Sequence, residues 1–459
     1  MVPKQKGSID LPTEGRKRRR GFAAIDVGIE ANECIKIYLV NSVDEVDTAD
    51  SFCFEPVDLN RFFGEDGRIY GYKDLKIDIW LNGISFHAYA DISFQSTFNG
   101  SKGTTDLDPA LKKIFGESLV EKKEEFLQTF TTDRHYISTI ISHGEVVHCE
   151  ASKGRDNTTQ NLVIRMGLRS MPVGELYSRL VPLVFLNVEG GSAIDVTDPR
   201  WDIYLVVERK AGQSGTIDSK LLGFASIYRF FHYPDSTRLR ISQILVLPPY
   251  QGQGYGRLLL ETLNSMAIYE NVYDVTAEEP SDYLQHVRGC IDTLRLLAFE
   301  PIKPAITSVT SQLKQSNFSK KTSKFHSDPP ANVVEGVRKL FKINKKQFLR
   351  CWEVLIYLSL DTKDRLCMEN FRACIFDRVK AYVLGKDVGS AGKNLTDVPN
   401  DYEHDMTFVM FRSRAAGGAL DAEVDGNQKV KEEQLGQVVN ERMEEIVEIA
   451  KKVSLHCRS

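Results

Sequence analysis

The sequence predicts an α+β protein, because segments with strand periodicity and segments with helix periodicity are mixed along the chain. Residues 34–40 and 77–81 alternate in the manner of half-buried strands. Residues 119–130 carry apolar side chains at helical spacing. Near the middle of the chain, an apolar strand over residues 241–247 leads through a glycine-rich turn into a helix whose apolar stripe starts at Leu258.

Composition is that of a large chain without a membrane or metal signature. The 459 residues, of which 42% are hydrophobic, are enough for two or three domains. We expect an intracellular protein that does not enter membranes, because no run of eighteen apolar residues and no signal-like segment is present. The eight cysteines form no Cys-x-x-Cys pair, which argues for reduced thiols and no metal site. The net charge of −4 disfavours nucleic-acid binding and leaves room for an acidic groove that attracts a basic peptide.

The pattern divides the chain into four regions. A basic tail over residues 1–21 has too few apolar side chains to fold. An α+β domain over 22–160 and a core over 161–304 follow. The core is expected to hold a helix near 176–188, strands at 204–208 and 222–231, the strand and helix around the glycine-rich turn, and a strand that ends at Glu278. Residues 305–459 form a mostly helical region with a loop near 385–428.

Within the last region, polar residues dominate 308–332, and helical patterns resume at 333–340 and 345–359. A final helix over about 432–453 places one apolar stripe on its surface, made of Leu435, Val438, Val439, Met443, Ile446 and Val447. Because a loop-like stretch at 417–426 precedes this helix, it is either loosely attached or docks on a partner. At the other end of the chain, the dense basic cluster over 16–20 is either a nuclear-import signal or a solvated tail.

The glycine-rich turn has the geometry of an anion site. Glycines let the backbone approach a ligand closely, and the first N–H groups of the following helix lack partners within the helix. The turn lacks the lysine and hydroxyl of a phosphate-binding P-loop. Its Gly-x-Gly-x-Gly spacing at Gly252, Gly254 and Gly256 also differs from the dinucleotide fingerprint. A structural turn without a ligand remains the alternative.

The strand-Pro-Tyr-Gln-Gly-Gln-Gly-Tyr-Gly-helix pattern resembles the Gln/Arg-x-x-Gly-x-Gly/Ala motif of the GNAT superfamily of N-acetyltransferases. The flanks narrow the resemblance to the catalytic subunits of type B histone acetyltransferases, with a plant-like character. It rests on residues 240–243 and 274–281 beside the turn, and on distant segments in the same order: 63–66, 71–73, 194–196, 200–201, 233–235 and 341–345. The similarity spans roughly residues 22–360 and implies a mainly antiparallel sheet flanked by helices.

By this resemblance the cofactor is acetyl-CoA, with its pyrophosphate at the turn. The expected cofactor-binding residues are Ile244, Leu245, Val246, Gln251, Gly252, Gln253, Gly254, Tyr255, Gly256 and Ser281. Pantetheine is expected to pair with the strand edge over 244–246, because the prolines at 248 and 249 have no N–H and end the strand ladder. The backbone N–H groups of Leu245 and Val246 are the expected donors to the oxyanion of the transition state.

A lysine amine with a pKa near ~10.4 needs a base at neutral pH. Glu278 is the expected base, because it shares one strand face with Asp274 and Thr276 and matches the general base of the family. Glu279 and Glu189 align with family residues beside that base. A solvated carboxylate at the end of a strand is the alternative for Glu278. The motif holds no nucleophilic cysteine, which favours direct transfer in a ternary complex.

The resemblance implies that the substrate is the tail of newly made histone H4, carried with H3, and that other core histones are poorer substrates. The expected substrate-binding residues are Glu65, Asp66, Trp201, Tyr228, Arg229 and Phe230, although the aromatic ones are equally explained as core. A WD40 histone chaperone of the retinoblastoma-binding type is the implied partner, with a location in nucleus and cytoplasm. Two other functions stay open: acetylation of protein N-termini or small amines, and non-catalytic acyl-CoA binding.

Overall fold

The computed structural model describes residues 27–48, 50–64, 66–98, 103–151, 159–211, 217–315, 327–383 and 424–457. Its contacts divide the described chain into two units. The N-terminal unit runs to Arg134 and includes Ser178–Ala193, and the C-terminal unit comprises His135–Tyr177 and the residues from Ile194 onward. The expected basic tail, with its cluster at 16–20, lies outside the described residues, as does most of the loop expected near 385–428.

A five-stranded sheet forms the centre of the N-terminal unit. Its order is β3 (Cys53–Phe54), β2 (Ile35–Val40), β6 (Lys76–Asn82), β7 (Ala88–Ser93) and β9 (Leu119–Val120). The strands expected at 34–40 and 77–81 are confirmed as β2 and β6, which run parallel to each other. The expected helix at 119–130 differs in its first turn, because residues 119 and 120 pair with β7 before α3 (Lys123–Thr132) begins.

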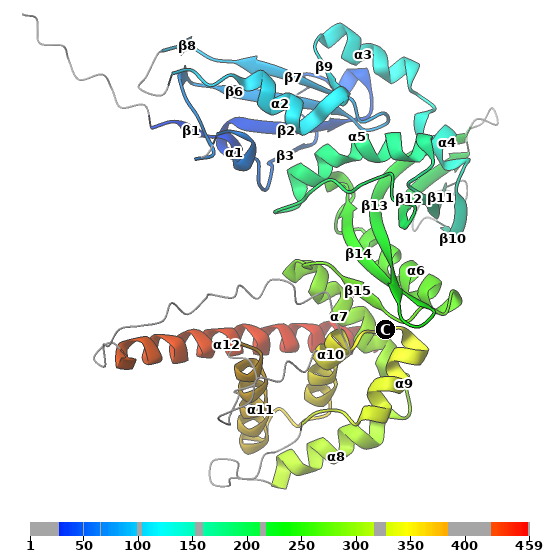
Figure 1. Ribbon diagram of the computed structural model, residues 1–459, viewed down its shortest axis with the longest axis vertical. Helices are drawn as coiled ribbons and strands as arrows, with labels where there is room; N and C mark the ends of the chain where they lie inside the picture. The colour runs from blue at the N-terminus through cyan, green and yellow to red at the C-terminus, as the bar shows by residue number, and fades with distance from the viewer. Residues whose placement is uncertain are drawn as a thin grey trace, which may run out of the picture. The chain divides into compact units, whose positions relative to one another are not determined.

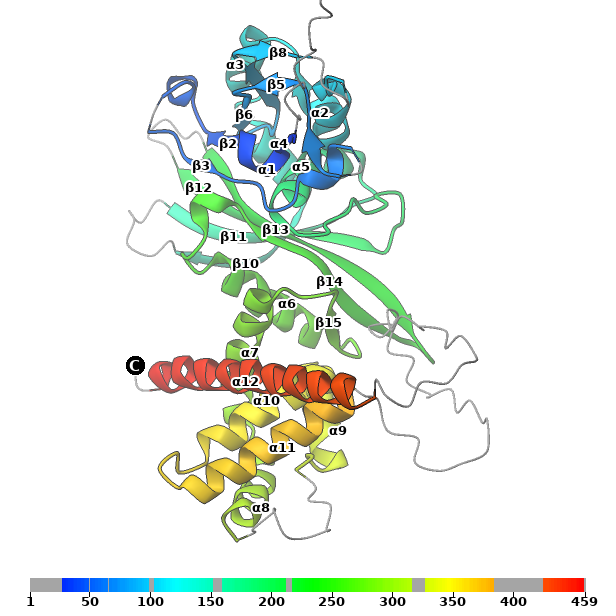
Figure 2. The ribbon, with the colours of Figure 1, turned by 90° about the vertical axis from the view of Figure 1, so that its left-hand side faces the viewer.

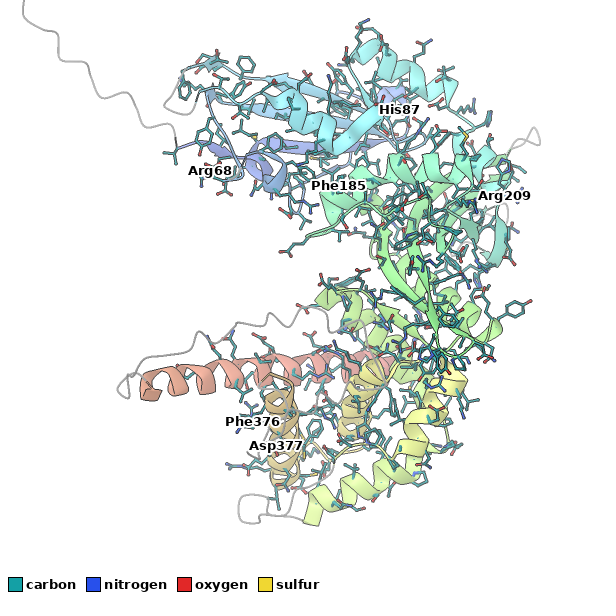
Figure 3. All side chains as sticks on the ribbon, viewed as in Figure 1. Arg68, His87, Phe185, Arg209, Phe376 and Asp377 are labelled. Atoms are coloured by element: carbon teal, nitrogen blue, oxygen red, sulfur yellow. The ribbon has the colours of Figure 1, made fainter. Side chains whose placement is uncertain are left out.

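The smaller elements of this unit complete it. They are β1 (Ile29–Glu30), α1 (Ala31–Cys34), β4 (Arg68–Ile69), β5 (Tyr72–Lys73), β8 (Ser96–Thr97), α2 (Leu107–Phe115) and three 3₁₀ turns. The second half of α5 (Met171–Asn187) belongs here and carries Phe185, which is labelled in Figure 3. The ring of Phe185 meets that of Phe62 at 5.2 Å between centroids. The Arg61 guanidinium lies over both rings, which adds a cation–π contact to the apolar packing.

A six-stranded sheet organises the C-terminal unit (Figure 1). In order its strands are β10 (Glu145–Ala151), β11 (Thr159–Gly167), β12 (Trp201–Ala211), β13 (Ile217–His232), β14 (Ser236–Val246) and β15 (Val275–Ala277). All neighbours are antiparallel except β14 and β15. This is the mixed, mainly antiparallel sheet that was expected. The expected domain boundary at residue 160 falls inside β11, because β10 and β11 pair with this sheet rather than with the N-terminal unit.

One face of this sheet is covered by α6 (Tyr255–Tyr269), which follows the glycine-rich turn. The stripe that includes Leu259 and Leu263 packs on Ile227, Ile241 and Val275 of the sheet in one apolar cluster. Helix α4 (Tyr136–Ile141) precedes β10, and α7 (Asp282–Leu297) follows β15.

The remaining helices form a cluster that shares its core with α7. They are α8 (Ile302–Gln315), α9 (Ala331–Phe341), α10 (Lys345–Leu358), α11 (Arg365–Val383) and α12 (Val424–His456). Helix α8 overlaps the stretch from 308 that the sequence marked as polar. Its buried residues Ile302, Ile306, Val309 and Leu313 keep helical spacing, while serines, threonines and lysines between them mask the pattern. None of the described helices is long and apolar enough to span a bilayer.

Helix α12 packs against α7, α10 and α11 of its own chain (Figure 2). It is therefore neither loosely attached nor left open for a partner on its apolar side, and it begins inside the expected loop. Its buried positions are Leu435, Val439, Ile446, Ile449, Ala450 and Val453, whereas Val438 of the expected stripe is 42% exposed. The ion pair of Arg442 with Glu353 of α10 ties the helix down further, and Arg378 of α11 binds the same carboxylate at 2.8 Å.

Removing the side chain of Ile446 tests this docking. We expect Ile446→Ala to lower the free energy of unfolding by about 2 to 5 kcal/mol, because the side chain is fully buried. The exposed Val438 on the same helix provides the control: Val438→Ala should change it by less than about 0.5 kcal/mol. Denaturant titration followed by circular dichroism measures both. Equal effects of the two substitutions would mean that α12 is not docked as described.

Candidate functional site

The turn between β14 and α6 is an open anion cradle. After Val246 the chain makes a 3₁₀ turn at Pro248–Tyr250, and α6 begins at Tyr255. Gly252 and Gly254 have φ values of +73° and +98°, which side-chain-bearing residues rarely adopt. A Cβ at either would meet nothing within 4 Å, and no side chain caps α6, whose N-cap is Gly254. The positive end of the α6 dipole therefore lies at an open glycine turn that no side chain caps.

The two glutamines of the turn brace its backbone. The Gln251 side-chain amide donates to the Val246 carbonyl at 3.0 Å, and that of Gln253 donates to the Pro249 carbonyl at 3.2 Å. Both were expected to bind cofactor. Here their side chains fix the backbone of the turn.

Other expected cofactor residues also contribute through the backbone or through a cap. Tyr255 is buried in the cluster under α6, so its ring is not offered to a ligand. Gly256 occupies the second position of that helix. The Ser281 hydroxyl caps α7 by accepting from the Leu284 N–H at 3.3 Å.

The neighbouring strand edge is open where the cofactor was expected to pair. Strand β15 pairs with β14 over three residues and stops at Ile241 and Ala277, whereas β13 follows β14 as far as Gly223 and Val246. In the described part of the chain, no strand covers β14 on the β15 side beyond Ile241. The two parallel strands thus separate and leave a backbone edge next to the glycine-rich turn.

Alternation along β14 decides which backbone groups face this edge. The Leu247 N–H donates to the Leu222 carbonyl of β13 at 2.9 Å. Because groups on an antiparallel strand alternate in direction, Leu245 also faces β13, while Ile244 and Val246 face the open edge. Leu245 was expected to donate to the oxyanion, and this part of the expectation is wrong. The Val246 N–H remains the candidate, since Gln251 already engages the Val246 carbonyl.

Glu278 stands at the point where the two strands part. Its N–H donates to the Ile241 carbonyl at 2.9 Å, and its Oε2 accepts a hydrogen bond from the Ser242 hydroxyl at 2.7 Å. The side chain is otherwise exposed, as a proton acceptor for an incoming substrate must be. Glu279 follows with a φ of +34°. Glu189 lies in the turn after α5, in the N-terminal unit, and its role stays a prediction.

The face that carries Glu278 is as the alternation predicts. Val275 and Ala277 pack under α6, so Asp274, Thr276 and Glu278 lie on the opposite face. Asp274 is buried and binds the Arg238 guanidinium through both oxygens, at 2.6 and 2.9 Å. This bidentate pair holds β15 to β14 at the start of their paired stretch, which runs from Leu239 and Val275 to Ile241 and Ala277.

The helical cluster supports β15 from its other edge. The Val275 N–H donates to the Lys342 carbonyl at 2.8 Å, and Ile343 forms a parallel bridge with Val275. The Asn344 side-chain amide donates to the Val275 carbonyl at 2.8 Å, while its Oδ1 accepts from the Gln347 N–H and caps α10. One side chain thus joins the start of α10 to the strand that ends at Glu278. The sequence marked residues 341–345 only through the family resemblance, because nothing in a linker between helices announces a strand contact.

Three aromatic rings line the same sheet face. Trp201 meets Tyr228 at 4.7 Å between centroids, and Tyr228 meets Phe230 at 4.5 Å. The Arg240 guanidinium lies 4.4 Å from the centre of the Phe230 ring. Burial, and then the hydrogen bond to the Asp198 carboxylate, raise the pKa of the Tyr228 hydroxyl. These rings are half-buried, so each offers part of its surface to a ligand.

Arg229 does not line that face, which corrects the expectation. Its guanidinium projects to the α6 side and pairs with Asp202 at 2.7 Å and with Glu270 at 2.8 Å. Arg165 binds the same two carboxylates. Side chains alternate along a strand, so a residue between Tyr228 and Phe230 has to face the other way. Arg229 therefore ties the sheet to the end of α6.

The acidic turn of the N-terminal unit is described in part. Glu65 lies outside the described residues. The Asp66 carboxylate accepts from the Tyr70 hydroxyl at 2.5 Å and from the Arg68 N–H at 3.3 Å. Asp66 is exposed, and its role in substrate binding stays a prediction.

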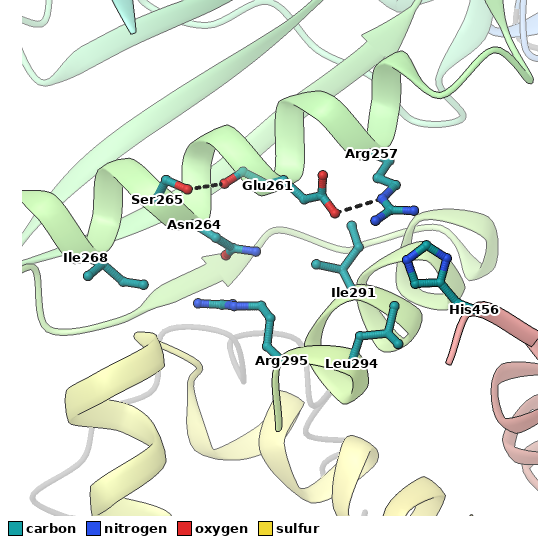
Figure 4. A pocket seen from close by; sticks show the side chains of 9 residues that line it. All are labelled: Arg257, Glu261, Asn264, Ser265, Ile268, Ile291, Leu294, Arg295 and His456. Atoms are coloured by element: carbon teal, nitrogen blue, oxygen red, sulfur yellow. Dashed lines mark hydrogen bonds and ion pairs between the residues drawn. The ribbon is translucent and has the colours of Figure 1, made fainter. Parts of the chain in front are cut away.

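A pocket of about 380 Å³ lies between α6, α7 and the end of α12 (Figure 4). Its lining consists of Arg257, Glu261, Asn264, Ser265, Ile268, Ile291, Leu294, Arg295 and His456. None of the expected site residues lines it, and Arg257 is paired with Glu261 at 2.7 Å. Over the described ranges, no three His, Cys, Asp or Glu side chains gather as metal ligands would.

Two models of acetyltransferase families match this chain. Residues 27–189 match the family model described as histone acetyl transferase HAT1 N-terminus, and residues 196–280 match the acetyltransferase (GNAT) family. The GNAT match covers β14, the glycine-rich turn, α6 and β15. Acetyltransferases of this fold use acetyl-CoA, and the open glycine cradle and strand edge fit that molecule.

Two plant proteins are similar to this chain over nearly their full length. The chain is 50% identical to the histone acetyltransferase type B catalytic subunit of Arabidopsis thaliana, over 99% of this chain and 98% of that protein. It is 47% identical to the subunit of the same name from Zea mays, over 100% and 98%. The human subunit is 28% identical, over 76% of this chain and 79% of that protein.

Substitution of Gly256 tests the anion cradle. A Cβ there would make only an ordinary contact, 3.7 Å from Val246 Cγ2, so the fold should tolerate it. The carboxylate of an Asp in the first turn is attracted to the positive end of the helix dipole. It therefore competes there with the pyrophosphate. We expect Gly256→Asp to weaken acetyl-CoA binding at least about 10-fold more than Gly256→Ala, without loss of melting temperature. Equal affinities of the two variants in calorimetry would contradict the assignment.

Proposed function

Because this chain belongs to the family of type B histone acetyltransferase catalytic subunits, we propose that it acetylates lysine side chains in the N-terminal tail of newly made histone H4. It is an acetyltransferase with a GNAT domain. One observation supports the proposal most strongly: the carboxylate of Glu278 stands where β14 and β15 part, at the start of an open backbone edge that leads to the anion cradle.

The chain's groups suit direct transfer. The N–H groups of the turn and of the first turn of α6 bind the pyrophosphate, and the open edge at Ile244 and Val246 pairs with pantetheine. The lysine amine attacks the thioester carbonyl, and the Val246 N–H donates to the oxygen that gains negative charge. The attack forms a tetrahedral intermediate. Its collapse releases the thiolate of CoA and leaves the acetyl group on the lysine nitrogen.

Glu278 takes the proton that the amine must lose. At pH 7 only a few parts in ten thousand of a lysine with a pKa near ~10.4 are the free amine. A general base offsets this, typically by about 10² to 10⁴ in rate. The carboxylate acts directly or through one water, and the proton passes on to solvent or to the leaving thiolate. Glu279 and Glu189 are proposed to assist in this proton transfer.

Substrate recognition is proposed to use the aromatic face and the acidic turn. Trp201, Tyr228 and Phe230 offer ring surface to lysine stems and to a glycine-rich backbone, on the sheet face that carries Glu278. Glu65 and Asp66 are proposed to pair with basic residues of the tail. A WD40 histone chaperone that presents H4 together with H3 raises the effective concentration of the tail, in nucleus and cytoplasm.

Replacement of the base tests the mechanism. Glu278→Gln keeps the shape and removes the proton acceptor, so kcat on an H4 tail peptide should fall by about 10² or more, with acetyl-CoA affinity unchanged. The deficit should shrink as pH rises toward 10, because the substrate amine then loses its proton unaided. Steady-state kinetics from pH 6 to 10 measure it, with Glu279→Gln as the matched control. Near-normal turnover of Glu278→Gln at pH 7 contradicts the assignment.

Adjacent phenylalanines test the substrate face. Phe230 lies beside Tyr228, whereas Phe231 is 70% exposed on the opposite face of the same strand. Phe230→Ala should raise KM for the H4 peptide about 5-fold, without changing KM for acetyl-CoA. Phe231→Ala should leave both unchanged. If spermidine or free N-terminal peptides are acetylated as well as the H4 peptide, the substrate proposal fails.

A further inference from the structure

Ser242 lies at an irregular point of β14, the strand whose open edge is proposed to pair with acetyl-CoA. The register between β13 and β14 shifts there: Ser226 pairs with Gln243, and Ile227 pairs with Ile241. Ser242 is therefore the extra residue of a β-bulge. A bulge re-aims side chains and bends a strand, and it occurs here directly after Ile241, the last β14 residue that pairs with β15.

Buried hydrogen bonds fix Gln243, the residue that follows the bulge. The Gln243 Oε1 accepts from the Tyr177 hydroxyl at 3.1 Å and from the Ser226 hydroxyl at 3.2 Å. All three side chains are buried, and the Tyr177 oxygen in turn accepts from the Ile194 N–H at 3.1 Å. Buried polar groups that satisfy one another in this way define one backbone arrangement. The position of the Ser242 hydroxyl is therefore set by the core rather than by solvent.

The partner of that hydroxyl is an exposed carboxylate with few other restraints. The Ser242 hydroxyl donates to the Glu278 Oε2 at 2.7 Å and anchors the side chain. The backbone of Glu278 is fixed by its bond to the Ile241 carbonyl, which leaves the side-chain torsions to be restrained. A donor on Oε2 selects one rotamer and leaves Oε1 for a second hydrogen bond.

We propose that Ser242 is the positioning residue for proton transfer: its hydroxyl orients the Glu278 carboxylate so that the other oxygen meets the attacking amine or its bridging water. The inference rests on the proposed role of Glu278 as the base. Ser242 acts only through that carboxylate and exchanges no proton with the substrate. Its contribution to kcat thus depends on Glu278 being present.

Kinetics of the full chain with acetyl-CoA and an H4 tail peptide test the proposal. Ser242→Ala should lower kcat about 10-fold, with KM for both substrates unchanged. Ser242→Thr retains the hydroxyl and should restore most of the activity. Ser265→Ala, which removes a hydroxyl bonded to a helix carbonyl of α6, is the control and should behave as wild type.

A double-mutant cycle separates positioning from a structural role. In the Glu278→Gln background, Ser242→Ala should cause little further loss, because the two residues act as a unit. Multiplicative losses, or a fall in activity that follows the melting temperature in both Ala and Thr variants, would overturn the inference. Wild-type kinetics of Ser242→Ala beside an inactive Glu278→Gln would overturn it too, while leaving the proposed function intact. If Glu278→Gln remains active, Glu278 is not the general base, and the proposed mechanism fails together with the inference.

Discussion

The early separation of two parallel strands is the constraint on which the site depends. Strand β15 pairs with β14 only as far as Ile241, and β14 continues alone on that side to Val246. Unpaired backbone N–H and C=O groups at a sheet edge can form hydrogen bonds with another extended chain. Here the open edge ends at a turn where a Cβ on Gly252 or Gly254 would meet nothing within 4 Å. The two features together fit a long molecule with an amide-bearing arm and a pyrophosphate.

The rest of the C-terminal unit keeps that opening fixed. Asp274 and Arg238 hold the strands together at the start of their paired stretch. From the other side, Asn344 and Ile343 attach β15 to the helical cluster, whose core includes α12. An exposed carboxylate at the end of a three-residue strand would otherwise lie on a poorly restrained segment. The helical region therefore stabilises the strand of the acetyltransferase core that ends at Glu278.

Sequence patterns were informative where chemistry depends on residue type or on simple alternation. Glycine spacing located the turn, and alternation placed Glu278 on the face opposite α6. The same rule, applied to residues 228–230, would have placed Arg229 with Asp202 rather than with the aromatic rings. Applied to β14 it fails, because the bulge at Ser242 reverses the direction of every later residue and leaves no mark in the sequence. Contacts between distant segments, such as the one from Asn344 to Val275, were likewise beyond any local pattern.

The central claim is that the open edge of β14 and the Glu278 carboxylate face one reaction centre. A crystal structure with a conjugate of CoA and an H4 tail lysine tests it most directly. We expect the acetyl oxygen within hydrogen-bond distance of the Val246 N–H, and the lysine nitrogen within reach of Glu278, directly or through one water. A conjugate that lies along another edge of the sheet, or a lysine nitrogen remote from Glu278, would contradict the account.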